Sequence, residues 1–279
     1  MNQAKTLLLI VAMTGVLVWI GGMVGGESGM VLALVLGLAL NGFSYFFSDR
    51  IVLASYGAQV IGPEDAPALH AIVANLAQRA GLPMPRIAII GEDTPNAFAT
   101  GRDPDHAVVA VTEGLMRILS RPELEAVIAH ELGHVKHRDI LIGSLAAVLA
   151  QAIMFLSRMA IWFTPRDDEG RSNPIAGIAI MILGPIAALL LQMAVSRSRE
   201  YMADDYSAHL TGRPDMLASA LERLHSYNQQ LPMASAQPAT AHMMIVSPLS
   251  GGGVMGLFST HPPMEVRVER LRQMPIEAR

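Results

Sequence analysis

The sequence predicts an α+β domain attached to a bundle of about four membrane-spanning helices. Two observations point to this fold class. First, 52% of the 279 residues are hydrophobic, only 16% are charged, and the mean hydropathy is +0.38, which is typical of a membrane protein. Second, long apolar stretches alternate with segments that carry the shorter helix and strand patterns of a folded domain.

Residues 1–50 predict a transmembrane hairpin. Residues 6–24 carry no charge and approach the roughly 20 residues that a helix needs to cross a bilayer. A glycine-rich turn follows, and residues 30–47 form the second span. Because Lys5 precedes the first stretch, that stretch could instead be a signal peptide. The immediate return into a second span favours the hairpin.

Residues 51–139 predict the first part of a mixed α+β catalytic unit. Gly81 and Pro83 would end its first helix. The expected elements are this helix over residues 63–80 and short strands over residues 86–90, 96–100 and 106–112.

The next helix is predicted by its first residues. Ser120 can cap the free N–H groups, and Glu123 can reach back to complete a capping box. Pro122 suits the first turn because its missing N–H has no helical partner there. Apolar residues then recur with helical spacing as far as Val135. A helix should therefore begin just after Ser120.

This helix contains the most informative motif in the chain, His130-Glu131-Leu132-Gly133-His134. Positions i and i+4 share one face of a helix, so both imidazoles can reach one metal ion. Glu131 can then take a proton from a metal-bound water, as a zinc peptidase requires. The alternative is two histidines on an ordinary amphipathic helix, and the presence of Glu131 between them argues against it.

A catalytic zinc site usually has a third protein ligand. The best candidates are Glu200 and Asp204, which share a helical face. One carboxylate could bind the metal while the other accepts the free ring N–H of a histidine ligand. The pair could instead be a solvated face neutralised by Arg197 or Arg199. Asp139 is another possible partner for a ligand histidine, or simply part of an exposed helix end.

Several short motifs together resemble one family, the HtpX-type membrane zinc metalloproteases, which are related to the CAAX prenyl endopeptidases. The matching segments occur in the family's order and are residues 96–101, 128–135, 196–197, 200–201, 203–204 and 259–263. The resemblance implies an α+β zincin-like catalytic domain on a bundle of about four transmembrane helices. It also implies that His130, His134 and Glu200 bind one zinc ion per chain and that Glu131 is the general base.

Residues 140–195 are predicted to form a second hairpin, with apolar stretches at 140–163 and 174–195. Both exceed the usual length of a core helix, which favours membrane insertion over a buried hairpin of the soluble domain. With Lys5 and Arg50 inside, both termini and the catalytic part would face the cytoplasm. The resemblance supports this multi-pass topology, in the inner membrane of a bacterial cell.

Residues 196–279 complete the predicted catalytic unit, with a mobile loop at 229–258 and a C-terminal helix. His261 precedes that helix and could donate a hydrogen bond to the oxyanion, although a helix-start role is the commoner one. Asn96 lies in a strand that could pair with an extended substrate. Residues 108–111 are the alternative edge.

The predicted function is zinc-dependent hydrolysis of peptide bonds. A net charge of −4 without a basic cluster argues against nucleic acid as a partner. The chain has no cysteine, which excludes disulfides and thiolate ligands. The resemblance implies polypeptide substrates, mainly misfolded or damaged membrane proteins, and a role in stress response and protein quality control. An intramembrane protease and a non-enzymatic metal-binding scaffold remain the alternatives.

Overall fold

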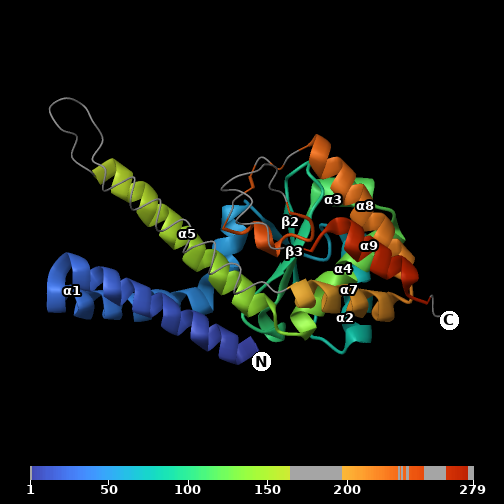
Figure 1. Cartoon of the computed structure of the whole chain (residues 1–279). Coiled ribbons are helices and arrows are strands. Elements are labelled where there is room, and N and C mark those ends of the chain that lie inside the picture. Colours follow the sequence, from blue (N-terminus) through green and yellow to red (C-terminus); the bar gives the residue numbers. More distant parts are fainter. Residues whose placement is uncertain are drawn as a thin grey trace.

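The computed structural model describes residues 2–163, 197–231, 233, 235–236, 239–247 and 262–275. An α+β body carries two helical elements, α1 (Asn2–Ser55) and α5 (Ile140–Phe163), which extend away from it in the same direction (Figure 1). The predicted span at 174–195, His261 and much of the predicted loop at 229–258 lie outside the described residues.

Helix α1 folds back on itself. The Asn41 side chain donates a hydrogen bond to Thr14 Oγ1 at 3.0 Å, whereas residues 27 positions apart on a straight helix would be separated by about 40 Å. The turn is at Gly26, whose φ of 59° is left-handed. A side chain on Gly21 or Gly29 would collide with the other's backbone, so both glycines are needed where the two arms meet.

The returning arm of this hairpin, Gly26–Ser55, is long and apolar enough to cross a membrane. Large apolar side chains along it are exposed, among them Val31 at 62% and Leu36 at 58%. An exposed row of this kind is unfavourable in water and marks a surface that meets lipid or another apolar partner.

Helix α5 coincides with the predicted stretch at 140–163, and its first half is buried. Ile142, Leu145 and Leu149 are fully buried, and Ser144 donates a hydrogen bond to the Ile140 carbonyl. Of the 24 residues of α5, those near the body are therefore packed against α1 and β3. Length and apolar composition do not distinguish this packing from insertion into lipid.

A four-stranded sheet forms one layer of the body. Its order is β1 (Gln59–Ile61), β2 (Arg86–Ile90), β4 (Val108–Thr112), β3 (Ala97–Thr100). The β2–β4 pair is parallel and the other two pairs are antiparallel. The strands predicted at 86–90, 96–100 and 106–112 are confirmed within two residues. The short edge strand β1 was not predicted. Strand β3 forms the opposite edge.

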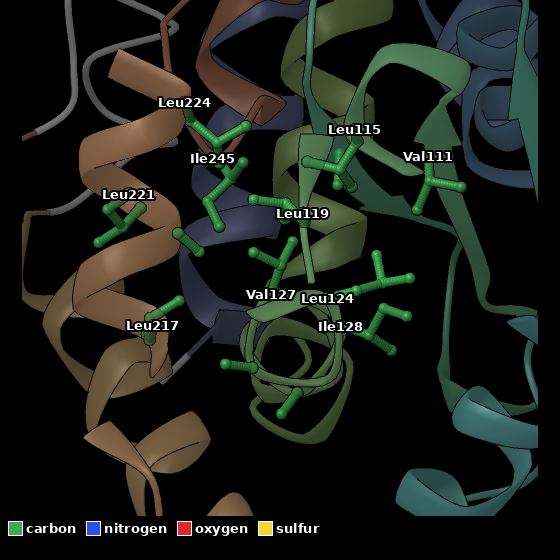
Figure 2. Packing of buried hydrophobic residues seen from close by; sticks show 14 of the residues in the cluster. Val111, Leu115, Leu119, Leu124, Val127, Ile128, Leu217, Leu221, Leu224 and Ile245 are labelled. Atoms are coloured by element: carbon green, nitrogen blue, oxygen red, sulfur yellow. The ribbon is translucent and has the colours of Figure 1, made fainter. Parts of the chain in front are cut away.

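Further helices of the body lie beside this sheet. They are α2 (Pro67–Ala80), α3 (Glu113–Ile118), α4 (Arg121–Lys136), α7 (Arg197–Thr211), α8 (Pro214–Gln230) and α9 (Met264–Gln273). Helix α4 lies at the centre of the body, where it packs directly on β3 and β4 and contacts α7, α8 and α2. Figure 2 shows its Val127 near Ile245, and both belong to one buried cluster with Leu221 and Leu224 of α8. Burying each such leucine contributes about 1.5–3 kcal/mol.

The predicted start of α4 is confirmed. The Ser120 N–H donates a hydrogen bond to Glu123 Oε2 at 2.8 Å, as a capping box requires. Glu123 also accepts a hydrogen bond of 2.6 Å from Ser219 Oγ of α8. The cap therefore fixes α4 to its neighbour as well as stabilising its first turn.

Candidate active site

The two histidines of α4 face the same point. His130 Nε2 lies 3.2 Å from His134 Nε2. The His130 side chain is buried, whereas 18% of the His134 side chain is exposed. The site therefore lies at the end of a buried helix face with limited access from solvent.

Helix α7 brings Glu200 to both histidines. Glu200 Oε1 lies 3.6 Å from His134 Nε2, and Oε2 lies 3.8 Å from His130 Nε2. The close approach of α7 to α4 depends on Gly133, because a Cβ there would lie 3.2 Å from the Cα of Ala203. Metal–ligand distances for zinc are about 2.0–2.2 Å, so ligand atoms with this spacing can share one ion.

The free nitrogen of His130 faces a carboxylate. His130 Nδ1 lies 2.9 Å from Asp204 Oδ1, one helical turn beyond Glu200. A hydrogen bond from Nδ1–H to Asp204 leaves Nε2 unprotonated and directed at the site, as a metal ligand requires. Burial would raise the pKa of Asp204, but Arg267 outweighs it, so that pKa is lowered. Burial lowers the pKa of His130, which favours the neutral ligand form.

The other histidine has its own carboxylate. Arg138 adopts a left-handed φ of 57° and ends α4, so that Asp139 turns back and its N–H donates to the His134 carbonyl at 2.9 Å. Asp139 Oδ2 then lies 3.6 Å from His134 Nδ1. Burial opposes protonation of His134, but Asp139 and Glu200 raise its pKa to about 9. A metal ion must therefore displace a proton from this ring.

Glu131 is a buried carboxylate whose oxygens make no hydrogen bond of normal length among the described residues, with the Ala99 backbone as a weaker partner. Burial raises its pKa to about 7, with a further contribution from Glu200 and an opposing one from His134. Such a weakly paired buried group needs a functional explanation. A water molecule or a substrate group beside the histidines would supply the missing partner.

The charges of the site also fit a divalent cation. Four carboxylates are buried together, Glu131, Asp139, Glu200 and Asp204. Two guanidinium groups are buried beside them: Arg199 lies 3.5 Å from Asp139, and Arg267 contacts Asp204 and Glu200. If all four carboxylates are ionised and both histidines are in the neutral form that a metal requires, two negative charges remain, and a divalent cation would neutralise them. Uncompensated buried charges are strongly unfavourable, so this donor set fits Zn²⁺.

The edge strand β3 passes beside this group. The Thr112 N–H donates to the Asn96 carbonyl, so Ala97 and Ala99 direct their backbone groups away from β4. The Ala97 carbonyl already accepts a hydrogen bond of 3.0 Å from the Ile245 N–H. Ala99 lies close enough to Glu131 to affect its pKa.

The Asn96 side chain holds the segment that covers the first part of this edge. Its amide nitrogen donates to the Val246 carbonyl at 2.8 Å, and its side-chain oxygen accepts from the Ala97 N–H at 3.1 Å. Asn96 is fully buried in this position. A direct role in substrate binding would require these hydrogen bonds to break.

Sequence reasoning missed Arg267, the largest fully buried side chain of the described residues. The sequence contained a sign of it. On the C-terminal helix, Arg267 shares a face with the buried Val268 and Leu271, and a charge on an apolar helix face needs a partner.

The fold and the site define the class of protein. An HExxH helix that faces a carboxylate from a second helix, beside the edge of a sheet, is the arrangement of a peptidase with a metal-binding site. The chain belongs to peptidase family M48, whose sequence profile matches residues 63–275.

The relatives agree with this assignment. The chain is 53% identical over 276 residues to the Protease HtpX homolog of Paraburkholderia phytofirmans, covering 98% of this chain and 97% of the relative. It is 56% identical over 277 residues to the Protease HtpX homolog of Desulforapulum autotrophicum, covering 97% and 89%. The resemblance predicted from the motifs is therefore confirmed.

A solved structure supports the fold. The crystal structure of S. mikatae Ste24p is similar to this chain with a TM-score of 0.52 and 18% sequence identity. The similarity covers 97% of this chain and 65% of the Ste24p chain. At this identity the likeness concerns the fold alone.

Proposed function

We propose that the protein is a membrane-anchored zinc metalloendopeptidase, with Glu131 as its general base. The observation that carries the proposal is the meeting of His130, His134 and Glu200 from two helices, with all candidate ligand atoms within 4.8 Å of one another. The weakly paired carboxylate of Glu131 next to this group supplies the base.

The proposed site would hold one zinc ion per chain. His130 and His134 would bind through their Nε2 atoms and Glu200 through its carboxylate. A bound zinc ion acts as a Lewis acid and lowers the pKa of its bound water. Asp204 and Asp139 would keep the two imidazoles in the tautomers that leave Nε2 free.

Glu131 carries the proton transfers. It would accept a proton from the attacking water and pass it to the leaving amine. Its burial suits this task, because a general base works best when its pKa is near the working pH. Its oxygens make no hydrogen bond of normal length among the described residues, so the carboxylate is available to the attacking water.

The proposed substrate is an extended polypeptide that pairs with the outer edge of β3. Ile245 occupies this edge at Ala97, so Ala99 is the residue whose backbone groups would pair with the substrate. The lone His261, which was predicted as a possible oxyanion donor, lies outside the described residues and remains a hypothesis.

The exposed apolar arm of α1 supports attachment to a bilayer. We propose that the chain is a multi-pass protein of the bacterial inner membrane, with its catalytic body in the cytoplasm. Misfolded or damaged membrane proteins would then be the substrates that this anchored site meets, which is consistent with a role in protein quality control and stress response.

The function is tested by degradation of a denatured protein by the full chain in detergent, with and without a zinc chelator. We expect the chelator to stop cleavage and added zinc to restore it. Cleavage that continues without any bound metal would contradict the proposed chemistry. A chain that binds zinc but does not cleave would instead indicate the non-enzymatic scaffold.

A further inference from the structure

We propose that Arg267 is a positioning residue of the metal site, which holds Asp204 against His130 and so fixes the direction of the first zinc ligand. This inference rests on the proposed metal site and adds a residue to it. Arg267 comes from α9, the last helix, and lies 63 positions beyond Asp204.

Arg267 holds Asp204 by two hydrogen bonds. Its Nε donates to Asp204 Oδ2 at 2.9 Å, and its Nη2 donates to Oδ1 at 2.7 Å. This paired geometry fixes the plane of the carboxylate as well as its position. The third contact of the guanidinium is from Nη1 to the Ile245 carbonyl at 3.0 Å. The side chain is fully buried, so Arg267 itself is held in place by its surroundings.

The same oxygen of Asp204 serves Arg267 and His130. Asp204 Oδ1 lies 2.7 Å from Arg267 Nη2 and 2.9 Å from His130 Nδ1. A carboxylate that can rotate would not hold the imidazole in one orientation. Arg267 removes this freedom, and the effect reaches His130 Nε2, the proposed ligand atom on the far side of the ring.

The guanidinium also approaches the third proposed ligand. Arg267 Nη1 lies 3.6 Å from Glu200 Oε2, which is too long for a good hydrogen bond but close for a charge interaction within a buried site. Arg267 is thus placed to affect two of the three ligands without touching the substrate or the reacting water. This is why it is a positioning residue and not a catalytic one.

Stability alone does not explain this arrangement. Replacing a buried ion pair by apolar side chains of similar volume is often neutral or stabilising. Lysine could not replace Arg267 either, because an ammonium group cannot form the planar two-bond contact with a carboxylate. A role in orienting the site accounts for both the burial and the choice of arginine.

The chain offers a matched control on the same helix. Arg270 pairs with Asp205, the residue next to Asp204, at 3.3 Å, and its side chain is 44% exposed. The pairs Arg267–Asp204 and Arg270–Asp205 thus join the same two helices, and of the two acids Asp204 is the one that contacts His130. If the loss of any arginine from α9 weakened zinc binding, a variant at Arg270 would therefore show the effect as well as a variant at Arg267.

The test measures zinc binding by the purified full-length chain in detergent, by competition with a chromophoric chelator. We expect Arg267→Met to weaken zinc affinity about tenfold or more, in the range found for partners of metal ligands, and to change the visible spectrum of the cobalt-substituted protein. Arg270→Met should leave both unchanged. In an Asp204→Asn background, adding Arg267→Met should weaken binding less than it does in the unaltered chain, because the paired contact with Asp204 is already lost and only the charge interaction with Glu200 remains.

The outcomes separate this inference from the proposed function. Wild-type zinc affinity and cobalt spectrum in Arg267→Met would overturn the positioning role alone. Absence of zinc binding by the unaltered chain and by Arg270→Met would end both proposals. If Arg267→Met does not fold, Arg267→Lys replaces it, since it keeps the charge but not the paired contact. Wild-type affinity in that variant would equally overturn the inference.

Discussion

The returning arm of α1 and the central helix α4 are opposites. The arm Gly26–Ser55 is apolar enough to cross a membrane, yet many of its large side chains are exposed. Helix α4 carries the charged and imidazole groups of the site, yet it is almost entirely buried. Burial in this protein therefore does not follow hydrophobicity. The difference indicates that α1 suits an apolar surrounding, whereas the polar groups of α4 are held away from water, as the proposed chemistry would require.

The largest expected effect is the loss of activity when Glu131, the proposed base on α4, is replaced. Glu131→Gln removes the proposed base and keeps its size, so peptide hydrolysis should fall about 10²- to 10⁴-fold while zinc remains bound. The matched control is Glu125→Gln on the same helix, whose carboxylate pairs with Arg121. Turnover and metal content of both purified variants provide the check. Near-normal cleavage by Glu131→Gln would remove Glu131 from the mechanism.

Replacing a leucine by alanine should lower the stability of the protein much more in α4 than in the returning arm of α1. Leu132→Ala on α4 creates a cavity at a fully buried site and should lower the free energy of unfolding by about 2–5 kcal/mol. Leu36→Ala on α1 removes a side chain that is 58% exposed, and in detergent it should change stability by less than about 0.5 kcal/mol. Thermal unfolding of both variants tests the contrast, and equal losses would contradict it.

A smaller effect is expected where the arms of α1 meet. Gly29→Ala places a methyl group against the backbone of Gly21, which should force the arms apart at a cost of about 1–3 kcal/mol. Gly42→Ala is the control, because a Cβ at Gly42 would meet nothing within 4 Å. Protease accessibility of the hairpin in detergent measures the change. A Gly29→Ala hairpin as resistant as that of Gly42→Ala would argue against close contact at Gly21.

The smallest expected effect is at the cap of α4. Burial would raise the pKa of Glu123, but hydrogen bonds from Ser219 and Ser120 outweigh it, so that pKa is lowered. A carboxylate whose pKa is lower in the folded than in the unfolded protein stabilises the fold at any pH above its unfolded-state pKa. This contribution is lost as the pH falls through its folded-state pKa. Glu123→Gln should therefore cost about 1 kcal/mol at neutral pH and less under acid conditions. Unfolding curves at several pH values provide the test. If Glu123 made no ionised contact, the free energies of unfolding of the unaltered chain and of Glu123→Gln would differ by the same amount at every pH.

Local features of the sequence predicted much of the body. The capping residues around Ser120 and the helical spacing after them fixed the start of α4, and β-branched runs fixed β2 and β4. These signals arise from neighbouring residues, so they can be read without the fold. Glu200 was identified because its spacing to Asp204 and its family motif agreed with the HExxH helix.

The parts that sequence reasoning missed depend on distant contacts. Arg267 meets Asp204 only because α9 packs beside α7. The first half of α5 has the composition of a membrane span, and only the fold shows that it packs against α1 and β3. The hydrogen bonds of Asn96 to Val246 likewise appear only when a segment 150 positions away is in place, and the substrate role of Asn96 stays a prediction.

The central claim is that two imidazoles of α4 and one carboxylate of α7 bind a single zinc ion. The most direct measurement is the zinc content per chain of the purified full-length protein and of its Glu200→Ala and Glu131→Gln variants, after dialysis against a weak chelator. One zinc ion per chain should remain in the unaltered protein and in Glu131→Gln, and it should be lost from Glu200→Ala. Full zinc retention by Glu200→Ala would contradict the account.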